Sequence, residues 1–329
     1  MTNAPQIDVL LYGLGAIGSF YAFVLSRSPR VRLTVVARSN YDAVKSHGLL
    51  INSQNHGQHR VKPYKVLKTP AEAGTTFDYI VCAHKAVDQW SVPAQIAPAV
   101  DEDKSTLVII QNGVGNEEPF RATFPAITII SCVTWVGARQ SSPGKIEHTT
   151  SEDMQIGLFP NLTHSPEMET QRMNDFASLL EGNTVFQIVP NIQIQRWEKV
   201  VWNAAWNPLT TLTLLDTHAW LRSSKDATPL TRKLMKEVID VARKLGVPVE
   251  YELVDRLMDK IQRMPPIGSS MQADFQSGRP MEVEVILGYP QMKGRELNVP
   301  VPVLETIYVI LTGVNQRLLK EPAKFRQGC

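Results

Sequence analysis

The first half of the chain consists of short apolar runs, each followed by a polar or glycine-rich turn. Runs of four to eight apolar residues that end in such turns are typical of buried strands. The clearest of them are residues 7–12, 31–37, 77–83 and 105–111. Later runs that can extend the same sheet are residues 127–136, 144–150 and 183–189. The pattern predicts an α/β fold with a largely parallel sheet.

From about Pro190 the pattern changes to the 3.6-residue period of amphipathic helices. Residues 228–248 and 301–320 are predicted as two long helices, and this half shows no sustained strand alternation. A chain of 329 residues is long enough for about two domains. We therefore predict an α/β domain over residues 1–190 and an all-α domain over residues 191–329.

One predicted helix carries a polar stripe. Within residues 196–210, Lys199, Asn203 and Asn207 recur every four residues among apolar neighbours. In an α-helix they form one stripe about 12 Å long. The stripe is either the narrow solvent face of a buried helix or the wall of a ligand cleft. Pro208 favours the cleft, because a proline removes a backbone donor and is predicted to end or kink the helix beside Asn207.

A glycine-rich turn joins the first predicted strand to a helix. Its residues are Gly13, Leu14, Gly15, Ala16, Ile17 and Gly18. The first glycine permits a tight turn, the second lets a pyrophosphate approach the backbone, and the third lets the helix pack against the strand. The phosphates would then meet the N-terminus of the helix. The turn predicts a dinucleotide-binding domain; the alternative is an ordinary strand-to-helix turn.

The residue after the second strand bears on the choice of cofactor. An NAD site usually has an acidic residue here for the ribose hydroxyls, but this chain has Arg38. A guanidinium can pair with a 2′-phosphate through charge-assisted hydrogen bonds. Arg38 therefore favours NADPH over NADH, and a surface arginine without a role is the alternative.

Two further strands end in polar residues, Lys85 and Asn112. Because ligands of open parallel sheets bind at the carboxyl ends of the strands, we expect both side chains to face the cofactor or the substrate.

Farther along, Glu282 and Glu284 flank Val283. On a helix these two carboxylates point about 200° apart, so at most one faces a given cleft; both could instead be surface charges.

Composition restricts the classes of function. The net charge of +2 argues against a dedicated nucleic-acid surface. Cys82, Cys132 and Cys329 cannot form a paired framework, which favours a reducing compartment. His56 and His59 have no ligands at metal spacing, so we predict solvated loop residues and no metal site. No run is long enough for a membrane helix, and we expect a cytoplasmic protein.

The chain resembles ketopantoate reductases (2-dehydropantoate 2-reductases) over nearly its full length. The motifs that carry the resemblance are Gly13-Leu14-Gly15-Ala16-Ile17-Gly18, Asn112-Gly113-Val114-Gly115, Lys199-x-x-x-Asn203-x-x-x-Asn207-Pro208-Leu209-Thr210, Ser269-Ser270-Met271 and Glu282-x-Glu284. The lysine and asparagine run is the most specific of these motifs. The resemblance implies a Rossmann-type N-terminal domain, an all-α C-terminal domain and an active site in the cleft between them.

The resemblance also implies roles for single residues. The function that the resemblance implies is NADPH-dependent reduction of a 2-oxo acid, in the first place ketopantoate to (R)-pantoate in pantothenate and coenzyme A biosynthesis. Lys199 matches the general acid, and Glu282 matches the glutamate that completes the site near cofactor and substrate. Residues that match substrate contacts are Asn112, Asn203, Asn207 and Ser270. Residues that match cofactor contacts are Lys85, Asn112 and Ala138. A small-molecule substrate and a monomer or homodimer are expected.

Two departures from the family pattern concern the substrate. Leu287 stands where better-studied members have asparagine, and residues 214–220 replace an asparagine-containing stretch. One alternative is therefore a reductase of the same family for another 2-oxo acid or ketone. A second is a redox-sensing NADPH-binding protein without catalysis, and a third is an NAD-dependent hydroxyacid dehydrogenase. The pair of Lys199 and Glu282 argues against the sensor, and Arg38 argues against the NAD enzyme.

Overall fold

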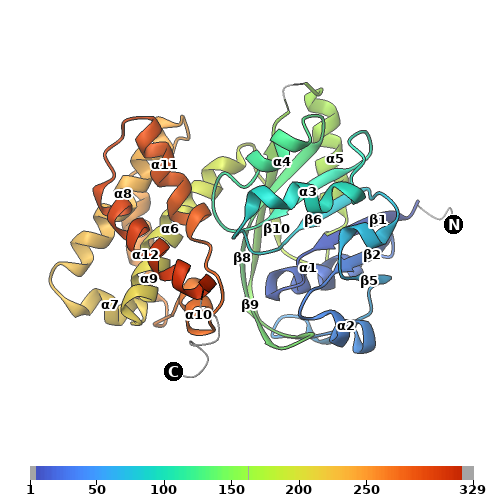
Figure 1. Ribbon diagram of the computed structural model, residues 1–329, viewed down its shortest axis with the longest axis horizontal. Helices are drawn as coiled ribbons and strands as arrows, with labels where there is room; N and C mark the ends of the chain where they lie inside the picture. Colours follow the sequence, from blue (N-terminus) through green and yellow to red (C-terminus); the bar gives the residue numbers. More distant parts are fainter. Residues whose placement is uncertain (1–4, 162, 321–329) are drawn as a thin grey trace. The chain divides into compact units, whose positions relative to one another are not determined.

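The computed structural model describes residues 5–161 and 163–320 of the chain. It divides into two compact units, one of residues 1–111 with 116–192 and the other of residues 112–115 with 193–329. All strands of the described residues belong to the first unit, and long helices make up most of the second (Figure 1). The predicted α/β N-terminal part and helical C-terminal part are confirmed.

The first unit contains one sheet in the order β4-β3-β9-β8-β7-β6-β1-β2-β5, with β10 paired to β9. Its strands are β1 (Ile7–Tyr12), β2 (Val31–Val36), β3 (Leu49–Ser53), β4 (Gly57–Val61), β5 (Lys65–Leu67), β6 (Tyr79–Cys82), β7 (Thr106–Ile110), β8 (Thr128–Ser142), β9 (Lys145–Phe159) and β10 (Phe186–Ile188). The central strands β8, β7, β6, β1, β2 and β5 are parallel, whereas β9 runs antiparallel to β8. All the predicted strands are present, and β8 and β9 are longer than the apolar runs that predicted them.

Helices cover both faces of the sheet. The helices of this unit are α1 (Ala16–Ser26), α2 (Tyr41–His47), α3 (Val92–Ile96), α4 (Glu118–Thr123) and α5 (Pro166–Ser178). One core cluster joins the sheet to α1 and α5, and a second joins its other side chains to α3 and α4. Because both faces are covered, the central strands are apolar throughout rather than alternating.

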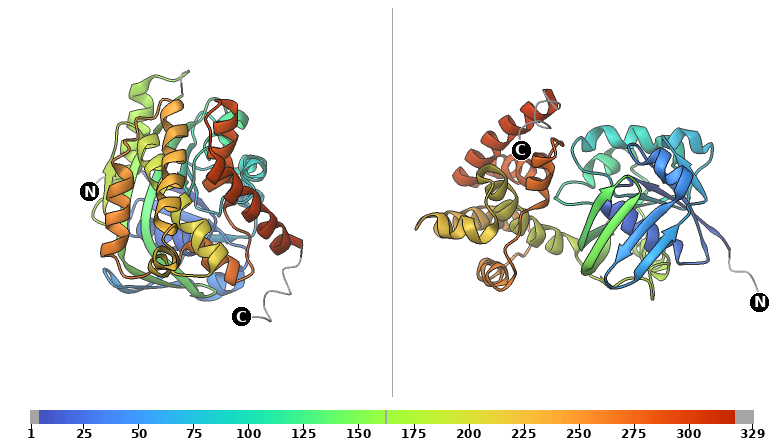
Figure 2. Two further views of the ribbon diagram at one scale, coloured as in Figure 1. Left: turned by 90° about the vertical axis from the view of Figure 1, so that its left-hand side faces the viewer. Right: turned by 90° about the horizontal axis from the view of Figure 1, so that it is seen from below.

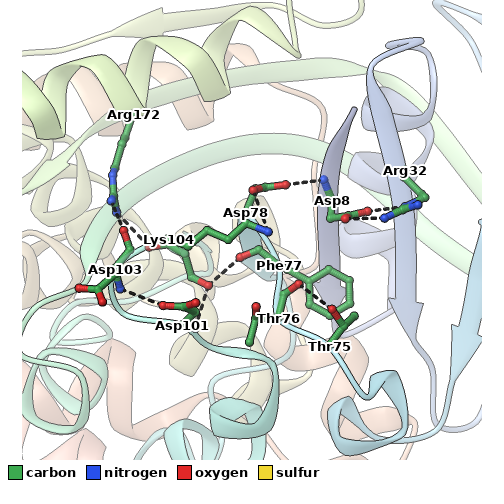
Figure 3. A network of polar contacts seen from close by, with 11 residues as sticks. Asp8, Arg32, Thr75, Thr76, Phe77, Asp78, Asp101, Asp103, Lys104 and Arg172 are labelled. Carbon is green, nitrogen blue, oxygen red and sulfur yellow. Dashed lines mark hydrogen bonds and ion pairs between the residues drawn. The ribbon is translucent and has the colours of Figure 1, made fainter. Parts of the chain in front are cut away.

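Charged side chains tie the amino ends of four parallel strands together (Figure 3). Asp8 at the start of β1 accepts two hydrogen bonds from Arg32 of β2. The backbone nitrogen of Asp8 donates to Asp78 before β6 at 2.7 Å, and Lys104 before β7 lies 3.2 Å from the same carboxylate. The network lies at the ends of the strands away from the glycine turn, so we assign it a structural role.

The second unit is a set of helices (Figure 2). They are α6 (Ile192–Thr213), α7 (Thr217–Ser223), α8 (Ala227–Lys244), α9 (Leu253–Arg263), α10 (Ser270–Gln276), a π-helical turn η4 (Glu284–Gly288), α11 (Tyr289–Glu296) and α12 (Pro302–Lys320). The two long helices predicted from periodicity correspond to α8 and α12. Buried Glu237 of α8 accepts hydrogen bonds from the backbone nitrogens of Val303 and Leu304, and so satisfies the first donors of α12.

Pro208 was predicted to end or kink its helix, and the first of these alternatives is wrong. Pro208 lies inside α6, which continues to Thr213. A proline in a helix interior costs about 3 kcal/mol, but residues 200–211 are all buried. Burying one large apolar side chain contributes roughly 1.5–3 kcal/mol, so the packing of several outweighs the proline. Thr211 also donates a side-chain hydrogen bond to the carbonyl of Asn207 at 2.6 Å.

Candidate active site

The glycine turn has the geometry that its spacing predicts. Gly13 adopts φ +102°, and a Cβ there would lie 2.3 Å from the backbone nitrogen of His84. A Cβ at Gly18 would lie 1.9 Å from the carbonyl oxygen of Gly13, so this glycine allows α1 to pack against the turn. A Cβ at Gly15 would meet no described atom within 4 Å. The backbone at Gly15, before the N-terminus of α1, is therefore accessible to a phosphate group.

Residues around this turn fix its position. Asn40 is buried and its side-chain nitrogen donates to the carbonyl of Leu14 at 2.5 Å. Asn40 also exchanges two hydrogen bonds with Gln140 of β8, at 3.0 and 2.9 Å. Gln140 is two residues beyond Ala138, which is half-buried on the same strand. The turn, the end of β2 and this part of β8 are therefore connected.

Arg38 and Lys85 are both exposed, one after β2 and the other after β6. Nη2 of Arg38 donates to the hydroxyl of Tyr12 at 3.0 Å. His84, next to Lys85, has its ring edge against Tyr12 with the centroids 5.0 Å apart. Burial lowers the pKa of His84 to about 4, so its imidazole is neutral at pH 7. The carboxyl ends of β1, β2 and β6 thus combine two exposed cations with a neutral ring.

In the second unit, the stripe of α6 is largely buried. Lys199 is half-buried, whereas Asn203 and Asn207 are 6% and 4% exposed. Their side-chain nitrogens have no hydrogen-bond acceptor among the residues that the structure describes, and the same holds for Nε1 of Trp206. A buried donor without an acceptor costs about 1–3 kcal/mol. Three of them on adjacent turns favour an acceptor that a ligand or water supplies, and the stripe is not a solvent face.

Asn112 and Glu282 meet in the same unit, although 170 positions separate them. Nδ2 of Asn112 donates to Oε2 of Glu282 at 3.2 Å, and Glu282 is 6% exposed. The segment 112–115 is held there by two further contacts. The backbone nitrogen of Val114 donates to the carbonyl of Val285 at 3.0 Å. Gly113 has φ +93°, and a Cβ there would lie 2.5 Å from Val285.

Arg196 connects this segment to α6. It is 1% exposed, and its Nη1 donates to the carbonyl of Gly113 at 3.0 Å. Arg196 also lies one helical turn before Lys199 on α6. Neither Arg196 nor Trp206 was predicted from the sequence to have a role. The available signal for Arg196 was its position three residues before Lys199, which places both on the same side of the helix.

The environment of Lys199 tunes its protonation. The pKa of Lys199 is lowered to about 7: burial is the largest cause, the charge of Arg196 also lowers the pKa, and the carboxylate of Glu282 opposes both. A lysine with this pKa exchanges its proton near neutral pH, which suits a general acid. Lys199, Arg196 and Glu282 thus form one electrostatic cluster of the second unit.

The remaining predicted residues are placed as follows. Ser270 is the first residue of α10 and is exposed. Its neighbour Ser269 accepts a hydrogen bond from Thr210 of α6 at 2.8 Å, so Ser269 makes the direct contact with this helix. Glu284 is exposed and accepts from the hydroxyl of Tyr308 at 3.0 Å, in contrast to buried Glu282. Only one of the two carboxylates therefore belongs to the cluster around Lys199.

Both departures from the family pattern have structural roles. Leu287 is fully buried in the π-helical turn η4. In the altered stretch, Asp216 caps α7 by accepting from the backbone nitrogen of Ala219 at 2.7 Å. Neither position adds a polar group to the cluster around Lys199 in the described structure.

The prediction that His56 is a solvated loop residue is wrong. His56 is half-buried and lies 2.7 Å from the carboxylate of Glu152 on β9, because the sheet brings distant residues to the β3–β4 turn.

Within the described residues there is no group of metal ligands. Cys82 and Cys132 are buried and form no disulfide among the described residues, and Cys329 lies outside them. None of the helices in the described part of the chain is long and apolar enough to span a membrane.

Two family models match most of the chain. The model described as ketopantoate reductase PanE/ApbA matches residues 9–161, and that of the ketopantoate reductase PanE/ApbA C terminal matches residues 191–315. The crystal structure of 2-dehydropantoate 2-reductase from Methylococcus capsulatus is 32% identical, covers 95% of this chain and 98% of that one, and has a TM-score of 0.82. The 2-dehydropantoate 2-reductase of Nostoc sp. is 26% identical over 91% of this chain and 92% of its own length.

The fold also occurs in a protein with a different name. The ternary structure of D-mandelate dehydrogenase with NADH and anilino(oxo)acetate covers 95% of this chain and 100% of its own, with a TM-score of 0.83 and 20% identity. At this identity the similarity concerns the fold alone. The two family models and the 32% identical structure are the decisive matches, and they show that the chain belongs to the ketopantoate reductase family of oxidoreductases.

Proposed function

We propose that this protein reduces a 2-oxo acid with NADPH, and that the substrate is ketopantoate, which becomes (R)-pantoate. Family membership supports an oxidoreductase that acts on a CH–OH group and uses a nicotinamide cofactor. The observation that carries the proposal is the set of polar groups on α6. Lys199 has a pKa of about 7, and the same helix carries the buried side-chain donors of Asn203, Trp206 and Asn207, which have no acceptor among the described residues. Such donors match the carboxylate that every 2-oxo acid carries.

The first unit fits the cofactor. The accessible backbone at Gly15 and the N-terminus of α1 would hold the pyrophosphate. The exposed guanidinium of Arg38 would pair with the 2′-phosphate that distinguishes NADPH from NADH. Lys85 and Ala138 are further proposed contacts, as are Asn112 and Glu282. When bound, the cofactor supplies the hydride for the carbonyl carbon.

The residues of the second unit would orient the substrate. We assign the side chains of Asn203 and Asn207 to the substrate carboxylate, because they are buried donors without acceptors. Asn112 and Ser270 are proposed as further substrate contacts. Hydrogen bonds from buried groups also give selectivity, since an analogue without the matching group leaves them unpaired.

Lys199 would complete the reaction. As hydride reaches the carbonyl carbon, negative charge develops on the carbonyl oxygen, and an ammonium group at that oxygen stabilises it and donates a proton. Burial and Arg196 make this proton easy to release, whereas Glu282 keeps enough of the lysine protonated at neutral pH. We propose Lys199 as the general acid and Glu282 as the residue that maintains its charge.

The test is oxidation of NADPH by the purified protein with a panel of 2-oxo acids. The panel contains ketopantoate, a branched aliphatic 2-oxo acid and an aromatic 2-oxo acid, and each is also assayed with NADH. We expect the highest kcat/KM with ketopantoate and NADPH. A higher kcat/KM with another member of the panel would keep the reaction type and replace the substrate.

The alternatives give different results in this assay. A redox sensor would bind NADPH tightly and turn over none of the acids. An NAD-dependent dehydrogenase would prefer NADH, as would be expected if Arg38 did not contact a 2′-phosphate. The donor set on α6 favours the reductase over the sensor, because a sensor has no need of buried donors for a second ligand.

A further inference from the structure

A chain of four hydrogen bonds ends on Arg38. Nη2 of Arg38 donates to the hydroxyl of Tyr12 at 3.0 Å, and this hydroxyl donates to Oε1 of Gln95 at 2.6 Å. Nε2 of Gln95 donates to Oγ of Ser91 at 3.1 Å, and Oγ of Ser91 donates to the carbonyl of Asp88 at 3.1 Å. We call Tyr12, Gln95 and Ser91 the relay.

The direction of the relay is fixed by its far end. A backbone carbonyl can only accept, so the single proton of the Ser91 hydroxyl points at Asp88. Ser91 must then accept from Gln95, which turns the amide oxygen of Gln95 toward Tyr12. The phenol has one proton and gives it to Gln95. Its oxygen is therefore left as an acceptor, and a guanidinium, which can only donate, is the group that it suits.

We infer that Tyr12 is a positioning residue for cofactor selectivity, acting through Arg38. The inference rests on the proposed function, because it takes Arg38 to bind the 2′-phosphate of NADPH. Tyr12 is 3% exposed in β1, directly before the glycine turn, whereas Arg38 is exposed after the neighbouring strand β2. A buried and rigid residue thus holds a flexible one beside the predicted phosphate site.

Holding Arg38 has a physical benefit. A free arginine side chain loses rotamer entropy when it binds a phosphate, and an arginine already bound at one N–H loses less. The contact with Tyr12 occupies one of the five N–H groups, so a paired edge remains available for two phosphate oxygens. The relay should therefore strengthen NADPH binding and have no effect on NADH, which lacks the 2′-phosphate.

The experiment measures dissociation constants of NADPH and NADH for wild type and Tyr12→Phe by fluorescence titration. Losing one hydrogen bond that orients a charged group should weaken NADPH binding roughly three- to tenfold and change NADH binding less than about twofold. KM for NADPH should rise while kcat is retained. The matched control is Tyr79→Phe, because Tyr79 is also buried in this sheet and its hydroxyl donates to the carbonyl of Arg172 at 3.1 Å. This variant should keep the wild-type ratio of the NADPH and NADH dissociation constants.

A second variant and a reference variant separate the possible outcomes. Gln95→Leu removes the acceptor of the phenol proton at an exposed position, and we expect the same selective loss. Arg38→Gln tests the phosphate contact itself. If Arg38→Gln leaves the ratio of NADPH affinity to NADH affinity unchanged, the proposed contact with the 2′-phosphate is wrong. If Arg38→Gln lowers the ratio of NADPH affinity to NADH affinity but Tyr12→Phe and Gln95→Leu leave it unchanged, only the role of the relay is overturned. The same conclusion follows if Tyr12→Phe and Gln95→Leu weaken the binding of both cofactors equally.

Discussion

Lys199→Met is expected to lower turnover at least about a hundredfold with the preferred 2-oxo acid, while the dissociation constant of NADPH stays within about twofold. A positioned general acid contributes roughly 10² to 10⁴ in rate, and methionine has neither a proton to donate nor a charge. The apolar stem is retained, so the packing of α6 is preserved. The control is Lys236→Met on α8, an exposed lysine of the same unit, which should keep wild-type turnover.

The same variant should be more stable than wild type. Burial lowers the pKa of Lys199 from an ordinary value of 10.5 to about 7. Between these values the unfolded chain binds more protons than the folded one, so the free energy of unfolding rises with pH in this window. Below pH 7 the folded protein holds a partly buried charge at full cost. Lys199→Met should thus raise Tm most at pH 6 and least at pH 10; a lower Tm at pH 6 would contradict this account.

The second large effect is expected for the amides of α6. Asn203→Leu and Asn207→Leu should each lower kcat/KM by about 10²-fold or more, because a site built to hydrogen-bond its substrate loses several kcal/mol when a partner is removed. Both variants should also keep or raise Tm, since an apolar group replaces a buried donor without an acceptor.

Charge provides the sharper version of this test. Asn203→Asp has nearly the same shape as wild type but places a negative charge where we propose that the substrate carboxylate binds. It should reduce kcat/KM more than Asn203→Leu does, and the loss should lie in KM as well as in kcat. Retention of wild-type kcat/KM in Asn203→Asp would remove this amide from the substrate site.

Local patterns predicted the first unit well. Part of the glycine turn depends on a contact over five residues, because a Cβ at Gly18 would lie 1.9 Å from the carbonyl oxygen of Gly13. The apolar runs predicted the strands because helices cover both faces of the sheet. The central strands are therefore apolar on both faces, and each is visible in the sequence as one continuous apolar run. The long β8–β9 hairpin extends past its apolar residues, because antiparallel pairing continues through polar ones.

Long-range packing accounts for what the sequence pattern missed. Pro208 was predicted to end or kink α6, but the helix continues to Thr213 because the burial of its neighbours outweighs the local cost of the proline. The segment 112–115 belongs to the helical unit through contacts with Val285 and Arg196 that lie far away in the sequence. The π-helical turn after Glu282 likewise has no simple periodicity, so the burial of Glu282 and exposure of Glu284 could be stated only as alternatives.

The central claim, that Lys199 is the general acid, is tested most directly by the pH dependence of kcat/KM between pH 6 and 10. Reduction needs the protonated lysine, so kcat/KM should fall as the pH rises through about 7. In Glu282→Gln the fall should begin at lower pH, because the carboxylate that raises the pKa of Lys199 is gone. A profile of wild type that stays flat over this range, or a shift of the Glu282→Gln profile to higher pH, would contradict the account.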